Sequence, residues 1–405
     1  MANSLTAASP TFWSANAGIK FYKIIIFRAI TDFSEESLLK NGGRIADRPY
    51  RSDVVAENYT KGTALTAQDL TYTSDTLTLD KQYSMLMYVD KIDKLQNKYN
   101  TVRLWSEEAG KRIGVRMDGD VLYEVFSVGS ANVFDAADLA GTSGEGIALT
   151  VINIQAIFGG IAQVLADNDV PDDESYFVVS PLFYNKLWQF IGGKESMLGD
   201  RTGETGNVGQ YGGMKIFKSR NITTKARWTP ADDPSNTATI AIQGITFTFV
   251  TTIGTTAGNI LISGTVAGTI DNLVALINAA GVTSDVGVSN VSLSTANQRT
   301  VQNWVAYDGT TYFEIRVKGS TDLTLTSSET ADTWDAKYES QCLMAGRKLA
   351  VSAAIQTDPM VDVEMASTVS AGKLGTNVMP LLVAGVKTFN LGTTELVRCE
   401  IRTDS

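Results

Sequence analysis

The sequence contains no histidine, and this absence limits the chemistry that the chain can perform. Histidine is the commonest general base at neutral pH and the commonest metal ligand in proteins. The absence of histidine therefore excludes most hydrolase and metalloenzyme mechanisms. The sequence also contains no Gly-x-Ser-x-Gly motif, which carries the nucleophilic serine of many hydrolases. We predict that the chain is not an enzyme and has no catalytic residue, no metal site and no cofactor.

Cysteine and long apolar runs are also scarce. Cys342 and Cys399 lie far apart, and we interpret them as two small buried side chains in a reducing cytoplasm. The strongest apolar cluster, residues 21–27, is interrupted by Lys23 and is too short to span a bilayer. The N-terminus lacks the basic flank of a secretory signal. We expect a protein made and folded in cytoplasm, without a membrane partner.

Basic residues are in a minority, with 34 Lys and Arg against 44 Asp and Glu and a formal net charge of −10. Such a chain gains little from the counterion release that drives binding to DNA, so the composition argues against a dedicated nucleic-acid reader. The composition, 43 % hydrophobic and 19 % charged, is that of a globular protein. A length of 405 residues allows two or three globular units.

The first 90 residues predict segments that need other surfaces to cover them, either the body of the fold or a neighbouring subunit. The arm, residues 1–48, carries large apolar side chains that so short a segment cannot bury alone, among them Phe12, Trp13 and Phe21. Residues 49–90 then alternate β-branched and polar side chains around a turn at Lys61 and Gly62, which predicts a two-stranded ribbon. Neither limb has an obvious core face, so we expect the ribbon to lie across another body.

Helical and strand patterns alternate between residues 92 and 217. Apolar side chains at three- and four-residue spacing predict a long one-sided helix over residues 92–126 and a second over 149–167. A buried strand is expected at 176–179, a third helix at 182–191 after Pro181, and a strand at 214–217. These elements indicate an α/β unit.

Residues 227–335 differ in composition, being rich in Thr, Ser and Gly with short recurring strands. One helix is expected there, capped by Thr269, running over residues 270–280 and closed by Gly281. We interpret this stretch as a self-contained β-rich insertion joined by linkers. Helical and strand patterns then resume at residues 342–355 and 361–402.

Three motifs invite a chemical reading that their context does not support. The glycine-rich residues 203–213 lack a Gly-Lys-Ser/Thr ending and lead into a strand, so a mobile loop is favoured over a phosphate site. The acidic clusters at 172–174 and 232–233 lack the spacing of a calcium loop and are expected to be solvated turns. Lys61 is expected to be solvated rather than engaged in an isopeptide bond.

Taken in order, several stretches resemble the major capsid proteins of tailed phages, which have the Hong Kong 97-type fold. Residues 47–62, 76–80 and 88–93 resemble the family's extended E-loop running into its spine helix, and 115–120 resembles the end of that helix. Residues 209–217 are similar to a strand of its axial domain, and 344–402 to the return into its peripheral domain. The resemblance spans the chain except for the insertion.

The resemblance implies an α+β chain organised as a Hong Kong 97-like capsid fold. Its expected parts are the N-terminal arm 1–48, the E-loop 49–90, a peripheral domain with spine helix at 91–130 and 357–405, an axial domain at 131–226 and 336–356, and the insertion 227–335. The implied function is a major capsid protein that assembles as hexamers and pentamers into the icosahedral shell around double-stranded DNA.

The expected partners are other copies of the chain, with scaffolding, portal and decoration proteins, and packaged DNA bound only non-specifically. The expected location is the virion, after assembly in the host bacterial cytoplasm. The residues predicted to make assembly contacts lie on the arm and E-loop: Phe12, Trp13, Phe21, Tyr50, Tyr59, Lys61 and Tyr72.

Three other functions stay open at this point. An encapsulin-type nanocompartment shares the fold and encloses cargo enzymes instead of a genome. A tail tube subunit would suit the insertion, although the long predicted helices argue against it. An enzyme or carbohydrate-binding protein could use Trp304, Tyr307 and Tyr312 of the insertion, although aromatic residues in strands usually belong to the core.

Overall fold

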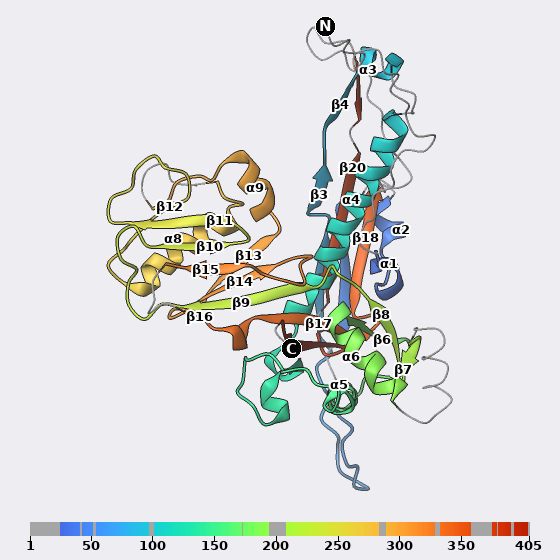
Figure 1. Ribbon diagram of the computed structural model, residues 1–405. Helices are drawn as coiled ribbons and strands as arrows, with labels where there is room; N and C mark the ends of the chain where they lie inside the picture. The colour runs from blue at the N-terminus through green and yellow to red at the C-terminus, as the bar shows by residue number, and fades with distance from the viewer. Residues whose placement is uncertain are drawn as a thin grey trace, which may run out of the picture.

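The computed structural model describes residues 25–40, 43–51, 54–96, 101–171, 173–193, 208–282, 289–328, 333–357, 375–378, 380–389 and 393–403. These residues form an elongated body with a β-rich unit projecting from one side (Figure 1). A long loop, residues 54–71, leaves one end of the body, and the short helix α3 (Lys91–Gln96) lies at the other end. The chain is therefore a mixture of helices and sheets, as the sequence predicted.

Helix α4 (Thr101–Tyr123) runs along the body and covers one face of its strands (Figure 1). Ile113, Met117 and Val121 follow each other at four-residue spacing and are all buried, which explains why this segment packs as a one-sided helix. A 3₁₀ turn, Glu124–Ser127, continues it. The sequence predicted one helix over 92–126; the structure describes helix at Lys91–Gln96 (α3) and at Thr101–Tyr123 (α4), and residues 97–100 lie outside the described part. In α3 the predicted apolar side chains Ile92 and Leu95 are exposed.

The central sheet contains ten strands among the described residues, in the order β13-β14-β9-β17-β6-β8-β7, with β16 on β9, β21 on β17 and β5 on β21. Its strands in the body are β5 (Val133–Phe134), β6 (Ser175–Val179), β7 (Gln210–Tyr211), β8 (Met214–Lys218), β9 (Thr223–Thr229), β17 (Ser340–Arg347) and β21 (Leu396–Arg402). The fully buried strand β6 confirms the prediction for 176–179.

Two cores lie on opposite faces of this sheet, since side chains alternate along each strand. On β17, Leu343 and Ala345 point into the core under helices α5 (Ile154–Asp167) and α6 (Pro181–Gly192). Cys342 and Met344 point into the other core, beneath α4 and the short helix α1 (Phe27–Ile30). Helix α6 begins where predicted, because Ser180 caps it and Pro181 is its first residue.

A second group of strands carries the ribbon that precedes α4. Strands β1 (Ile45–Arg51) and β2 (Tyr72–Thr78) pair antiparallel, as predicted. The other strands are β3 (Lys81–Ser84), β4 (Met87–Asp90), β18 (Val351–Thr357), β19 (Gly375–Val378) and β20 (Leu381–Thr388), in sheets β18-β20-β3 and β19-β4. The described parts of 342–355 and 361–402 are thus strands and turns.

The base of the ribbon has its own core, contrary to the expectation that neither limb would have one. Ala46, Leu77 and Leu79 are buried against Phe389, Ala354 and the helix α2 (Glu36–Lys40). Only the distal part, residues 54–71, lacks such support. The prediction failed at the base because the covering residues come from β18 and from the end of β20, more than 270 positions along the chain.

The projecting unit has a separate hydrophobic core that includes Trp228, Phe247 and Phe313. Its elements are β10 (Thr239–Ile242), β11 (Ile245–Val250), β12 (Asn259–Leu261), α8 (Val266–Asn278), α9 (Thr295–Val301), β13 (Trp304–Asp308), β14 (Phe313–Val317), β15 (Leu325–Ser327) and β16 (Thr333–Trp334). Helix α8 is capped by Thr265 and not by Thr269, which is buried one turn inside it. Gly281, at φ +75°, closes the helix as predicted.

Strand β9 joins this unit to the body without a linker. It pairs with β17 of the body from Thr223 to Lys225 and with β14 of the insertion from Thr224 to Trp228. One continuous sheet therefore passes from the body into the insertion. The boundary expected at residue 227 lies inside β9 (Thr223–Thr229), and the expected linker at residues 230–234 is an irregular segment that follows this strand.

Two neighbouring glycines in α5 allow a matched test of the packing between this helix and the sheet. A Cβ on Gly160 would lie 2.1 Å from the ring of Phe134, whereas a Cβ on Gly159 would meet nothing within 4 Å. We expect Gly160→Ala to lower the free energy of unfolding by about 1–3 kcal/mol. Gly159→Ala should raise it by up to about 1 kcal/mol, because alanine favours the helix. Urea unfolding of unassembled subunits measures both, and equal effects would contradict the α5 packing described here.

Candidate assembly surface and buried charge network

The distal loop, residues 54–71, together with Tyr72 exposes six large apolar side chains. Val54, Val55, Tyr59, Leu65, Leu70 and Tyr72 are each between 59 % and 72 % exposed. A two-way hydrogen bond between the backbone of Val55 and the side chain of Gln68 holds the two limbs of the loop together. Apolar side chains gathered on an extended loop mark an interaction site rather than a folded core.

The residues predicted to make assembly contacts do not form a single site. Tyr59, Lys61 and Tyr72 lie exposed on or beside the loop, with Lys61 and Gly62 at its turn. Tyr50 is partly buried at the base of the ribbon, where its ring lies 6.5 Å from that of Phe389. Its ring therefore already packs within its own chain. Phe12, Trp13 and Phe21 lie outside the described residues.

A second exposed apolar group lies at the opposite end of the body, around β4 and α3 (Figure 1). It consists of Leu86, Tyr88, Ile92 and Leu95, of which Leu95 is 78 % exposed. The two apolar groups lie at different ends of one elongated subunit, so they cannot cover each other within the chain.

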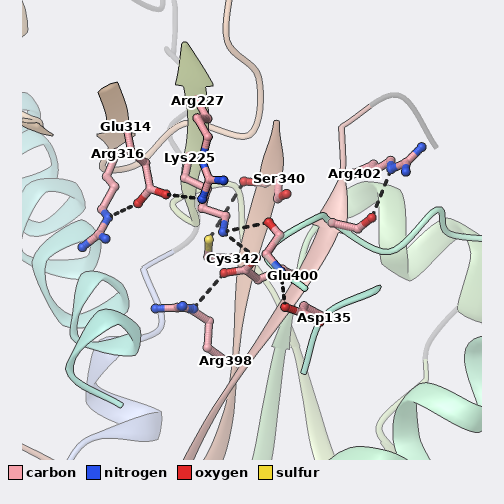
Figure 2. A network of polar contacts seen from close by, with 12 residues as sticks. Asp135, Lys225, Arg227, Glu314, Arg316, Ser340, Cys342, Arg398, Glu400 and Arg402 are labelled. Atoms are coloured by element: carbon pink, nitrogen blue, oxygen red, sulfur yellow. Dashed lines mark hydrogen bonds and ion pairs between the residues drawn. The ribbon is translucent and has the colours of Figure 1, made fainter. Parts of the chain in front are cut away.

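A network of buried charges crosses the central sheet where the insertion joins the body (Figure 2). Lys225 of β9 and Glu400 of β21 are nearly inaccessible, and Lys225 Nζ lies 2.6 Å from Glu400 Oε2. Arg398 Nε lies 2.9 Å from the other oxygen of the same carboxylate. The pKa of Lys225 is raised: burial lowers it, but Glu400 and other nearby negative groups outweigh burial. Lys225 therefore keeps its positive charge at neutral pH.

Glu314 of β14 extends the network into the insertion. Its carboxylate lies 2.8 Å from Arg316 Nε and 3.9 Å from an Arg227 nitrogen. Burial favours the neutral acid, but Lys225 and the two arginines together hold the pKa of Glu314 below its usual value. These charges share one face of the sheet, while the alternating residues Ala226, Trp228 and Ile315 face the insertion core.

Aromatic rings cover the arginines of this network. The guanidinium of Arg227 lies 3.9 Å from the ring centroid of Tyr312 and 4.1 Å from that of Tyr338. Phe126, at the end of α4, is contacted by Arg316 at 4.2 Å and by Arg398 at 4.8 Å. Stacking of this kind favours desolvated guanidinium groups. It also brings together the insertion, the end of α4 and β21.

The same contacts bear on the carbohydrate-binding alternative. Trp304 is 5 % exposed and belongs to the insertion core. Tyr312 stacks on Arg227, and of the three candidate aromatic residues Tyr307 alone is largely exposed. The three rings therefore do not form a common stacking surface for a sugar.

Two buried carboxylates on α4 tie separate parts of the chain to the helix. Asp118 Oδ1 accepts hydrogen bonds from the backbone N–H groups of Ile26 and Phe27, at 2.9 and 2.8 Å, and its Oδ2 accepts one from Asn221. Asp120 Oδ1 pairs with Lys318 Nζ of the insertion at 2.7 Å, and Asp120 Oδ2 accepts a hydrogen bond from the hydroxyl group of Tyr83. The helix is thus bonded to the N-terminal segment, to β3 and to the insertion.

Both cysteines are free thiols buried in the central sheet. Burial raises the pKa of Cys342 to about 12, and burial likewise raises the pKa of Cys399 well above its usual value. Neither is therefore a reactive thiolate at neutral pH. Cys342 pairs with Glu400 across the ladder and Cys399 with Leu343, so the two thiols lie on opposite faces of the sheet.

Among the described residues, no group of three or more His, Cys, Asp or Glu is arranged to hold a metal ion. Asp173 instead pairs with Arg347 at 3.1 Å, and Asp233 accepts a hydrogen bond from Thr269 at 2.6 Å. The end of the glycine-rich segment is the β7–β8 hairpin, and residues 194–207 lie outside the described part. No helix in the described ranges is long and apolar enough to cross a membrane.

Sequence reasoning missed the charge network. Its signal was present as alternation of charged and apolar residues in three strands, residues 225–228, 314–317 and 398–402. Such alternation predicts one apolar and one polar face, but it does not reveal that the three polar faces meet. Asp118 and Asp120 were noticed only as part of the family resemblance.

Removing one partner of the Lys225–Glu400 pair should be costly. Lys225→Met leaves Glu400 buried with less compensation, so we expect a loss of about 3–5 kcal/mol in the free energy of unfolding. Adding Glu400→Leu should recover part of that loss, because it removes the buried carboxylate that has lost Lys225, although it also leaves Arg398 without its partner. Arg112→Met, in the exposed pair with Glu108, is the control and should cost less than about 0.5 kcal/mol. Additive single-variant losses in urea unfolding would exclude the coupling.

The lowered pKa of Glu314 predicts a contribution to stability that acid removes. A carboxyl with a folded-state pKa below its unfolded value stabilises the fold above the unfolded pKa and loses that effect as pH falls through the folded one. The stability advantage of the wild type over Glu314→Gln at pH 7 should therefore shrink below about pH 4.5, the usual glutamate value. Unfolding curves between pH 7 and pH 3 measure this difference in stability, and Glu107→Gln, at an exposed position of α4, is the control. A stability difference that stays constant over this pH range would contradict the prediction.

Comparisons with known proteins give the fold its context. No protein-family model matches the chain, and no curated protein matches its sequence. A solved structure from Mycobacterium phage Che8 is similar over 96 % of both chains, with a TM-score of 0.55 and 11 % identity. The capsid structure of Cyanophage P-SCSP1u matches over 99 % of this chain and 95 % of its own, with a TM-score of 0.53 and 14 % identity.

A third structure, the capsid asymmetric unit of Cyanophage Pam1, covers 98 % of this chain and 97 % of its own, with a TM-score of 0.51 and 11 % identity. The likeness extends over nearly the whole length of both chains in each case. The resemblance inferred from the sequence is confirmed at the level of the fold. The chain has the α+β fold of phage capsid proteins.

Proposed function

We propose that the chain is the major capsid protein of a tailed phage, which assembles as hexamers and pentamers into the icosahedral shell around double-stranded DNA. The observation that carries this proposal is the end-to-end likeness to phage capsid structures at 96–99 % coverage of the chain. In this role the protein is a structural subunit of the virion rather than an enzyme.

The exposed apolar loop supports assembly through unlike surfaces. Residues 54–72 place six large apolar side chains in solvent, and a neighbouring subunit would cover them. Contacts of this kind, in which one surface of a subunit binds a different surface of the next, close into rings and shells when the rotation permits. The second apolar group, at Leu86, Tyr88, Ile92 and Leu95, offers another contact at the far end of the subunit.

In this proposal the parts of the chain have distinct roles. Residues 1–48 are the N-terminal arm, whose described part packs on the body through α1 and α2 and whose remainder clasps a neighbour, and 49–90 are the E-loop that lies over the adjacent subunit. Residues 91–130 and 357–405 form the peripheral domain, and 131–226 with 336–356 form the axial domain. The residues proposed to touch neighbouring subunits remain Phe12, Trp13, Phe21, Tyr50, Tyr59, Lys61 and Tyr72.

We place the insertion, residues 227–335, on the outer face of the shell. Between residues 230 and 334 the sequence has only three basic side chains, Arg299, Arg316 and Lys318. Arg316 and Lys318 pair with Glu314 and Asp120, so little positive charge is left to attract a phosphate backbone. An acidic unit of this kind is better placed away from packaged DNA, which the shell contacts only non-specifically.

The further partners in this proposal are scaffolding and portal proteins, with a decoration protein where the insertion leaves room for one. Assembly would take place in the cytoplasm of the host bacterium. An encapsulin-type compartment would have the same subunit architecture but would contain cargo protein, so the contents of purified particles separate the two functions.

Introducing charge on the loop tests the proposal. We expect Val55→Asp with Leu70→Asp to leave a folded, soluble subunit that forms no closed shell, because two charges would be buried in each contact. Val282→Asp with Leu349→Asp is the control at two other exposed apolar positions and should leave shells intact. Negative-stain electron microscopy after size-exclusion chromatography measures the result. Normal shells from the loop variant would contradict the role of the loop, and a wild type that stays monomeric with scaffolding protein present would contradict the proposed function.

A further inference from the structure

Strand β3, the second strand after the loop, is bound to α4 through the side chain of Tyr83. Strand β3 begins only three residues after β2 ends, so its position determines where the returning limb of the ribbon meets the body. The hydroxyl of Tyr83 donates to Asp120 Oδ2, and its ring lies 4.4 Å from the guanidinium carbon of Arg116. Both partners are on α4, four residues apart and on one side of the helix.

The same two residues of α4 hold the insertion. Asp120 Oδ1 pairs with Lys318 Nζ at 2.7 Å, at the end of β14. Arg116 donates through Nη2 to the backbone carbonyl of Gln302, at 3.3 Å, just before β13. Two separate routes, Lys318–Asp120–Tyr83 and Gln302–Arg116–Tyr83, therefore connect the insertion to the base of the ribbon.

The environment of Asp120 makes this connection sensitive to either neighbour. Its side chain is 4 % exposed, and its two oxygens take a cation from one side and a phenol from the other. Burial and the nearby carboxylate raise the pKa of Tyr83, so the phenol keeps its proton and acts as donor. Without Lys318, the buried carboxylate would lose its charge partner and would favour solvent over Tyr83.

We propose that Asp120 and Arg116 are positioning residues for the E-loop, through which the insertion sets the direction in which the loop leaves the body. This inference rests on the proposed capsid function and deepens it. The insertion then has an assembly role inside its own subunit, in addition to any role on the outer surface. Its contact with α4 becomes part of the mechanism that presents residues 54–72 to a neighbouring subunit.

The test uses the full-length chain with Lys318→Met, which keeps the length of the side chain and removes its charge. We expect faster backbone hydrogen exchange in peptides covering residues 72–84 of unassembled subunits. We also expect the protein concentration needed for shell formation to rise about tenfold, as a loss of ~1.4 kcal/mol in contact energy would produce. Lys337→Met is the matched control, since Lys337 is 57 % exposed and lies 3.8 Å from Glu145.

Two further variants separate positioning from general stability. Tyr83→Phe removes only the hydroxyl and should give the same exchange pattern as Lys318→Met, and the double variant should add little to either. Lys318→Arg keeps the charge and should restore assembly, which a role in packing alone would not require.

Different outcomes would overturn the inference and the proposed function. If the Lys318→Met subunit folds, shows wild-type hydrogen exchange at residues 72–84 and assembles like the wild type, the inference is contradicted. The proposed capsid function is unaffected by that outcome. Fully additive effects of Lys318→Met and Tyr83→Phe on exchange would contradict the inference in the same way. Wild-type protein that never assembles would refute the capsid function instead, whatever the exchange data.

Discussion

The pairing of strand β9 with β17 is the constraint on which the arrangement of the molecule depends. β9 forms three residue pairs with the body and seven with the insertion, five of them with β14 and two with β16, so the backbone hydrogen bonds of both units run through one strand. Its register places Lys225 beside Ser340 and Arg316, while the neighbouring β17–β21 pairing places Glu400 beside Cys342. The buried network depends on both pairings, because a shift of β9 by one residue would turn Lys225 and Arg227 to the apolar face.

Buried charges at this junction contribute differently from the apolar side chains of a core. Replacing a buried ion pair with apolar side chains often costs no stability, so the presence of these pairs does not show that the junction needs them to fold. They do fix its geometry, since each carboxylate has two cationic neighbours and each guanidinium has a ring to stack on. The insertion and the body strands β17 and β21 consequently belong to one sheet with one orientation.

The sequence predicted those helices and strands that are determined by neighbouring residues, such as an apolar run or a capping residue. Strand β6 was recognised from an unbroken apolar run, α6 from Pro181, and the end of α8 from Gly281. The start of α8 was misplaced because threonines stand at both 265 and 269, and only the fold determines which one faces solvent. The general fold was predictable because the order of the elements resembled that of a known family.

The candidate surfaces were predictable to a smaller extent. The exposure of Tyr59, Lys61 and Tyr72 was predictable, since a ribbon without an alternating core face is visible in the sequence. The partial burial of Tyr50 was not predictable, because Phe389, which packs against it, is remote in the chain. The Lys225–Glu400 pair and the two bridges of Asp120 join residues between 37 and 198 positions apart. No periodicity within a single segment encodes such contacts.

The two buried cysteines have a practical meaning for work on this protein. Both thiols are inaccessible and protonated at neutral pH, on opposite sides of a sheet that must unfold before a reagent can reach them. The chain is thus a natural background for site-specific labelling. A single cysteine introduced on the exposed loop would be the one reactive thiol in the native subunit, and a fluorophore or crosslinker attached there would report on the loop alone.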